Sequence, residues 1–171
     1  PLYVFYAIRE LHLGPAALGA AIAMGGVGAM LGSILGPLIG RRIGLGPTFI
    51  GAVFAIGLAS ALIPLAHGSV PMPLGYLSVQ QLLGDMAFAT FFINELTLRQ
   101  SVTPERILGR VNAAMQLATR GLFPLSALVG GTLAAAVGVR TPMAIAVCGL
   151  LSSSAWLILS PVRTLGGVPD P

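Results

Sequence analysis

The sequence contains no lysine and few charged residues of any kind. All nine basic residues are arginine, and charged residues make up 8% of the 171 residues. Without lysine the chain can form neither a Walker-type phosphate loop nor a lysine Schiff base. Soluble domains carry about a quarter charged residues. This composition cannot cover a water-exposed surface of normal size, which excludes a soluble globular domain.

Cysteine is nearly absent as well, because Cys148 is the only one in the chain. A single cysteine excludes an intrachain disulfide and a multi-cysteine metal site. His12 and His67 supply too few ligands for a metal, so we expect no metal and no cofactor. The arginines are scattered, which argues against a nucleic-acid partner. No nucleophile lies in a pattern with a base, so we do not expect an enzyme.

Apolar residues make up 56% of the chain and occur in long uncharged runs. A membrane-spanning helix needs about 20 such residues, and the runs lack the alternation of a barrel strand. We therefore predict an all-α membrane protein, a polytopic bundle of five transmembrane helices plus the end of a sixth. The predicted spans are 15–40, 46–66, 74–98, 110–137 and 142–161. Residues 1–8 are expected to end a helix whose start is missing, and 162–171 to form a cytoplasmic tail.

The arginines support this segmentation independently. Cytoplasmic loops of membrane proteins are enriched in basic residues. With the predicted spans, Arg9 and Arg140 fall on one side of the bilayer, and six arginines fall on the other: Arg41, Arg42, Arg99, Arg106, Arg110 and Arg163. The pattern predicts a cytoplasmic C-terminus.

Small residues form stripes on two of the predicted helices. Span 110–137 carries Gly121, Gly130 and Gly131, and span 15–40 carries glycines four residues apart at Gly28, Gly32, Gly36 and Gly40. Such spacing lets another helix backbone approach closely. The stripes indicate either static helix packing or a contact that slides during transport. We expect both stripes to face a partner outside this chain.

Polar and aromatic residues share one face of span 74–98. At 100° per residue the stripe holds Gln81, Asp85, Phe88, Phe92, Glu95 and Arg99. Charged residues at membrane depth normally face a cavity or a partner. The stripe favours a water-filled pathway for an organic substrate, and a structural polar seam is the alternative. Glu95 and Arg99 are four residues apart, so they could also form an ion pair at the helix end.

Arg120 is the one arginine predicted at membrane depth. It lies about 15 Å deeper along its helix than Arg110, at a depth similar to Asp85. A pair between Asp85 and Arg120 would be either a proton-sensitive latch or a permanent salt bridge.

Two predicted cytoplasmic loops carry a family resemblance. The run NELTLRQSVTP at 94–104, followed by LGRVNA at 108–113, resembles the loop between helices ten and eleven of major facilitator superfamily transporters. More narrowly, it resembles the bacterial drug-efflux and siderophore-export branch. The run GRRIG at 40–44 is similar to the superfamily's short basic loop between helices eight and nine.

The resemblance implies that residues 1–8 end helix seven and that the five spans are helices eight to twelve. The chain would then be a fragment, the C-terminal half of a transporter in the bacterial inner membrane. The expected function is export of a small organic compound by alternating access, coupled to proton entry. The alternative is a non-transporting membrane module, such as a sensor or an assembly subunit.

Overall fold

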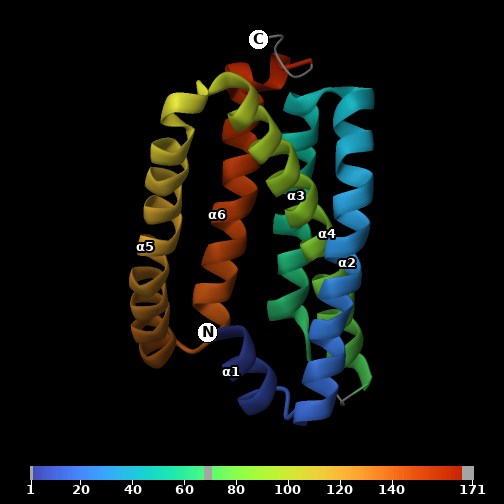
Figure 1. Cartoon of the computed structure of the whole chain (residues 1–171). Coiled ribbons are helices and arrows are strands. Elements are labelled where there is room, and N and C mark those ends of the chain that lie inside the picture. Colours follow the sequence, from blue (N-terminus) through green and yellow to red (C-terminus); the bar gives the residue numbers. More distant parts are fainter. Residues whose placement is uncertain (1, 68–70, 167–171) are drawn as a thin grey trace.

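The computed structural model describes residues 2–67 and 71–166, and these residues form helices without any strand (Figure 1). The first helix is short, and the five that follow are long. In chain order the elements are α1 (Leu2–Arg9), α2 (Pro15–Ile43), α3 (Leu45–Leu65), α4 (Pro71–Val102), α5 (Glu105–Val137), α6 (Arg140–Leu159) and the 3₁₀ helix η1 (Pro161–Thr164). The all-α prediction is confirmed for the described part of the chain.

The five long helices alternate in direction, so the turns gather at two opposite ends of the bundle (Figure 1). The α2–α3 turn, the α4–α5 turn and η1 lie at one end, which we call the arginine-rich end. Its arginines are Arg41, Arg42, Arg99, Arg106, Arg110 and Arg163. Arg9 ends α1 and Arg140 begins α6 at the opposite end.

The helix ends differ from the predicted spans mainly in α4 and α5. Helix α4 begins at Pro71 rather than at residue 74, because Pro71 and Pro73 lie in its first turn, where the missing N–H groups need no partner. Helix α5 begins at Glu105, five residues before the predicted span 110–137. Of the predicted tail 162–171, residues 162–164 belong to η1, and 167–171 lie outside the described residues.

In the part of the chain that the structure describes, four helices are long and apolar enough to cross a membrane: α2, α3, α5 and α6. The predicted count of five is therefore not confirmed, because α4 is not among them. Gln80, Gln81 and Asp85 lie near the middle of α4 and lower its hydropathy. These polar residues, which belong to or adjoin the predicted pathway stripe, therefore weaken the hydropathy evidence that α4 crosses a membrane.

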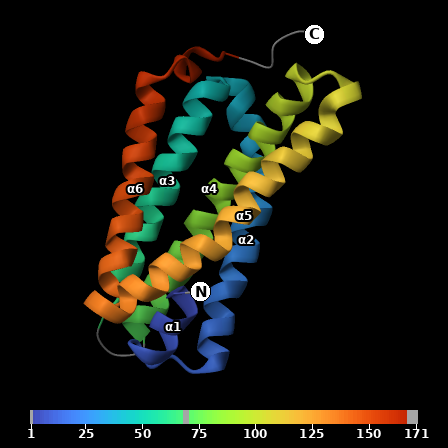
Figure 2. The same cartoon turned by 90° about the vertical axis from the view of Figure 1, so that its left-hand side faces the viewer.

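The long helices pack unevenly. Helix α4 packs along α2 and against α3, and α3 packs in turn against α6. Helix α5 contacts mainly α6 and α1, and none of its residues is buried. In Figure 2 it runs obliquely to the other long helices. The helices therefore form a closely packed group of α2, α3, α4 and α6, with α5 beside it.

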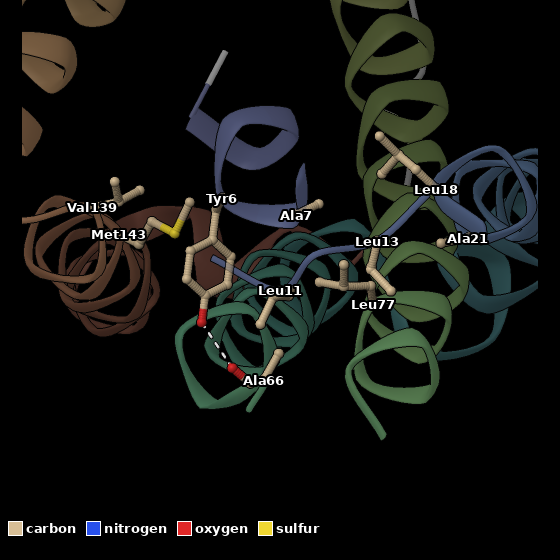
Figure 3. Packing of buried hydrophobic residues seen from close by; sticks show 10 residues of the cluster. All are labelled: Tyr6, Ala7, Leu11, Leu13, Leu18, Ala21, Ala66, Leu77, Val139 and Met143. Carbon is tan, nitrogen blue, oxygen red and sulfur yellow. Dashed lines mark hydrogen bonds between the residues drawn. The ribbon is translucent and has the colours of Figure 1, made fainter. Parts of the chain in front are cut away.

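Buried apolar side chains gather where α1 meets the other helices (Figure 3). Tyr6 is fully buried at the centre of this cluster, and its hydroxyl donates a hydrogen bond of 2.8 Å to the carbonyl oxygen of Ala66. The guanidinium of Arg140 lies 5.7 Å from the centre of the Tyr6 ring. These contacts fix α1 to the ends of α3 and α6.

The segment after α6 closes the arginine-rich end. Gly44, with φ of +92°, turns the chain from α2 into α3, a conformation that favours glycine. The Gly46 N–H donates a 2.9 Å hydrogen bond to the Leu165 carbonyl. A Cβ on Gly46 would overlap the carbonyl oxygen of Val162. Residues 162–165 therefore lie directly on the α2–α3 turn.

Gly46→Ala should destabilise the chain by about 1–3 kcal/mol, because the new methyl group would overlap backbone that cannot move as a side chain could. Gly51→Ala on the same helix is the matched control, since nothing lies within 4 Å of its Cβ position. Unfolding in detergent by titration with dodecyl sulfate, followed by circular dichroism, measures both. Equal stability of the two variants would contradict the packing of η1 on this turn.

Candidate functional site

The glycine stripe of α2 lies against the backbone of α4. A Cβ on Gly28 would overlap the carbonyl oxygen of Leu82, and one on Gly32 would overlap that of Met86. On Gly36 it would lie 2.9 Å from Thr90 Cα. All four glycines of the predicted stripe are buried in this contact: Gly28, Gly32, Gly36 and Gly40. For α2, the expectation of a partner outside the chain is therefore wrong.

The contacts between α2 and α4 rise together in residue number, from Gly28 with Leu82 to Gly40 with Asn94. The two helices are therefore parallel, as two helices separated by one antiparallel helix must be (Figure 1). At Gly28, Gly32 and Gly36 the nearest atoms of α4 are backbone atoms, so the two backbones are in direct contact along this part of the stripe. This contact sets which face of α4 remains uncovered.

Two polar side chains of α4 reinforce the contact. Thr90 Oγ1 donates to the Met86 carbonyl at 2.9 Å and lies 3.4 Å from the Gly32 carbonyl oxygen. Asn94 Nδ2 donates to the carbonyl oxygens of Thr90 at 2.8 Å and Gly36 at 3.1 Å. Both side chains are buried. Their spacing of four residues on α4 matches that of the α2 glycines, a signal that the sequence reasoning missed.

The polar and aromatic stripe of α4 lies on a less buried face. Gln81, Asp85 and Glu95 are partly exposed, and Phe88 and Phe92 are about half exposed. The two phenyl rings stack with centres 6.2 Å apart and an angle of 16° between their planes. The described chain therefore presents polar groups and an aromatic surface together on one face of α4.

Asp85 lies at the edge between this face and α2. A Cβ on Gly25 would overlap Asp85 Oδ2 and would lie 3.2 Å from Gln81 Nε2. The carboxylate and the amide thus approach α2 at a position where only a glycine leaves room. Gln81 and Asp85 were predicted from their spacing on α4, whereas Gly25 was not, because a glycine within a glycine-rich helix gives no separate signal.

Arg120 does not pair with Asp85. Its side chain is exposed on α5, which packs on α6 and α1 rather than on α4. Within the described residues the single salt bridge joins Arg99 and Glu95, with 3.2 Å between Nη2 and Oε2. The expected Asp85–Arg120 pair is therefore wrong for this structure, and Glu95 takes the ion pair within α4 that its spacing allowed.

The remaining predicted residues are Gly130 and the arginines of the predicted gate, of which Arg99 also belongs to the stripe. Gly130 of α5 faces α1, with its Cβ position 3.3 Å from Leu2 Cδ1. Arg41 lines a cavity of about 420 Å³ at the arginine-rich end, together with Asn94 and Thr97. The other predicted gate residues are on the last turns of α2 and α4 and on the start of α5: Arg42, Arg99, Arg106 and Arg110.

Neither the models of known protein families, nor the curated proteins, nor the solved structures contain a match to this chain.

Gly32→Ala should separate α2 from α4 and destabilise the chain by about 1–3 kcal/mol, because the methyl group would overlap the Met86 carbonyl. Gly26→Ala is the matched control on the same helix, with open space around its Cβ position. Its higher helix propensity should leave stability equal or greater. Titration with dodecyl sulfate followed by circular dichroism compares them, and a Gly32→Ala protein as stable as Gly26→Ala would refute the close contact.

Proposed function

We propose that this chain is the C-terminal half of a major facilitator superfamily transporter that exports a small organic compound. The observation that carries the proposal is the open face of α4, where Asp85 and Gln81 lie beside two stacked phenyl rings. The other long helices of the chain are apolar enough to span a membrane. A polar face among such helices is better suited to line a water-filled pathway than to contact lipid.

In this proposal α4 is a fifth membrane-crossing helix. It lies parallel to α2 with their backbones in contact, so it occupies the same depth as a helix that is apolar enough to span. Its buried residues face α2 and α3, which removes them from lipid. The polar residues that lower its hydropathy would then line the pathway.

The exposure of α5 supports a missing partner. None of its residues is buried, although its length and hydropathy would let it span a membrane. An N-terminal half of the same transporter would cover α5 and face the stripe of α4. Rocking of the two halves about the site between them would then give alternating access, with proton entry driving export.

The proposed location is the bacterial inner membrane, with the arginine-rich end in the cytoplasm. Six arginines lie at this end and two at the other, and basic residues are retained on the cytoplasmic side. The C-terminus would then be cytoplasmic, and Arg41 and Arg106 would flank the inner mouth of the pathway.

Cysteine labelling in inverted and right-side-out vesicles tests this topology. In a Cys148→Ser background, Arg41→Cys and Arg106→Cys should react with an impermeant maleimide only from the cytoplasmic face. Arg140→Cys should react only from the outer face. Reaction of residues 41 and 106 from opposite faces would contradict both the helix count and the proposal.

Proteoliposomes that contain only this chain should show no proton-coupled transport, because half of the pathway is absent. A pH-sensitive dye inside the vesicles measures proton movement when an organic solute gradient is imposed. Transport by the chain alone would overturn the proposed division into two halves.

The coding sequence upstream separates the transporter from the non-transporting module. We expect an adjoining reading frame that encodes six further spans. A complete gene without them would favour the sensor or assembly subunit.

A further inference from the structure

The cavity of about 420 Å³ at the arginine-rich end lies between the C-terminal parts of α2 and α4. Helix α3 and the segment after η1 complete its lining. The residues that α2 and α4 contribute are Pro37, Gly40, Arg41, Ile93, Asn94 and Thr97. None of these belongs to the polar and aromatic stripe of α4, so the cavity is separate from the proposed pathway.

The charge of the cavity is positive. Arg41 is the one charged residue among the described residues that line it. The single salt bridge of the described part of the chain joins Arg99 to Glu95, which leaves Arg41 without a carboxylate partner there. Arg42 is the next residue, and both arginines are exposed on the last turn of α2. The cavity is therefore suited to a ligand that carries a negative charge.

The two polar side chains of α4 at the cavity offer hydrogen-bond acceptors rather than donors. Asn94 Nδ2 already donates to the carbonyl oxygens of Thr90 and Gly36, which uses both of its N–H groups. Thr97 Oγ1 donates its hydrogen within α4, at 2.9 Å. The Asn94 oxygen, which lies against Gly40, and the lone pairs of Thr97 Oγ1 remain as acceptors. A ligand that also carries hydroxyl donors matches them.

A phospholipid presents both kinds of group at this depth. In the proposed orientation Arg41 ends a membrane-spanning helix at the cytoplasmic headgroup level, where basic pockets between helices bind anionic headgroups. The spacing of Met30, Ile34, Pro37 and Arg41 places all four on one face of α2. Met30 and Ile34 are exposed. A lipid with its headgroup at Arg41 would therefore have apolar side chains beneath it for an acyl chain.

We propose that this cavity binds the headgroup of an anionic phospholipid of the phosphatidylglycerol class, with the phosphate at Arg41 and the glycerol hydroxyl groups at Asn94 and Thr97. The phosphodiester supplies the negative charge, and the glycerol supplies two O–H donors. Phosphatidylethanolamine matches the site less well, because its ammonium would lie beside two arginines. The inference goes beyond the proposed function, since it concerns a lipid site outside the pathway.

Native mass spectrometry of the chain in detergent tests this inference, because each bound lipid adds its own mass. The probes are dioleoyl phosphatidylglycerol, dioleoyl phosphatidylethanolamine and dioleoyl phosphatidylmethanol, which keeps the charge and lacks the headgroup hydroxyls. Phosphatidylglycerol should bind about fivefold more tightly than phosphatidylethanolamine and about threefold more tightly than phosphatidylmethanol. Equal binding of phosphatidylglycerol and either other lipid would overturn the inference.

Substitutions then locate the site. Arg41→Gln should weaken phosphatidylglycerol binding about fivefold or more, because it removes a charge-assisted hydrogen bond. Arg163→Gln is the matched control, since Arg163 is exposed at the same end and does not line the cavity. Equal losses in these two variants would show attraction to the whole arginine-rich end and would overturn the site. Thr97→Val should at least halve the preference for phosphatidylglycerol over phosphatidylmethanol.

Circular dichroism checks that each variant keeps its helices. If Arg41→Gln loses them, Thr97→Val decides, and an unchanged preference for phosphatidylglycerol there contradicts the proposed contacts.

A soluble headgroup tests whether the ligand is a lipid. Glycerophosphoglycerol, which has the same headgroup without acyl chains, should not displace bound phosphatidylglycerol at an equal concentration. Displacement would overturn the assignment to a lipid. Cysteine labelling and proton transport test the proposed function separately, so either proposal can fail alone.

Discussion

The direct contact between the backbones of α2 and α4 is the constraint on which the rest of this structure depends. Four glycines at intervals of four residues remove every side chain from one stripe of α2, and the carbonyl groups of Leu82 and Met86 occupy the space. Thr90 and Asn94 add hydrogen bonds to the same stripe. Apolar burial contributes little between helices in lipid, so close packing and such bonds must supply the association.

This contact also determines the character of the open face. With α2 and α3 against its other sides, α4 is left with one uncovered stripe, and that stripe holds its polar and aromatic residues. Gly25 extends the glycine series by one turn, and there the neighbour is the Asp85 carboxylate instead of backbone. The same lack of side chains that joins the helices therefore also places the carboxylate. The packing of α2 on α4 and the polar face of the proposed pathway are therefore two parts of one arrangement.

The helices could be predicted from the sequence because long uncharged runs, with arginines gathered at one end of the predicted spans, are direct indications of membrane helices. The polar stripe of α4 could also be predicted, since 100° per residue fixes which side chains share a face. The helix that packs on the glycine stripe of α2 could not be predicted, because glycine spacing shows that a helix approaches but not which helix it is.

The prediction of an Asp85–Arg120 pair was wrong for a related reason. Similar depth on consecutive helices does not make them neighbours, and α5 packs on α6 and α1.

Distances between spin labels on α2 and α4 test the central contact most directly. In a Cys148→Ser background, one pair of labels would replace Ile22 and Val79, and a second pair would replace Leu38 and Phe92, all exposed positions. Parallel helices in backbone contact predict that double electron–electron resonance finds two short and similar distances. One short and one long distance, or broad distributions for both pairs, would contradict the contact that leaves the polar face of α4 open.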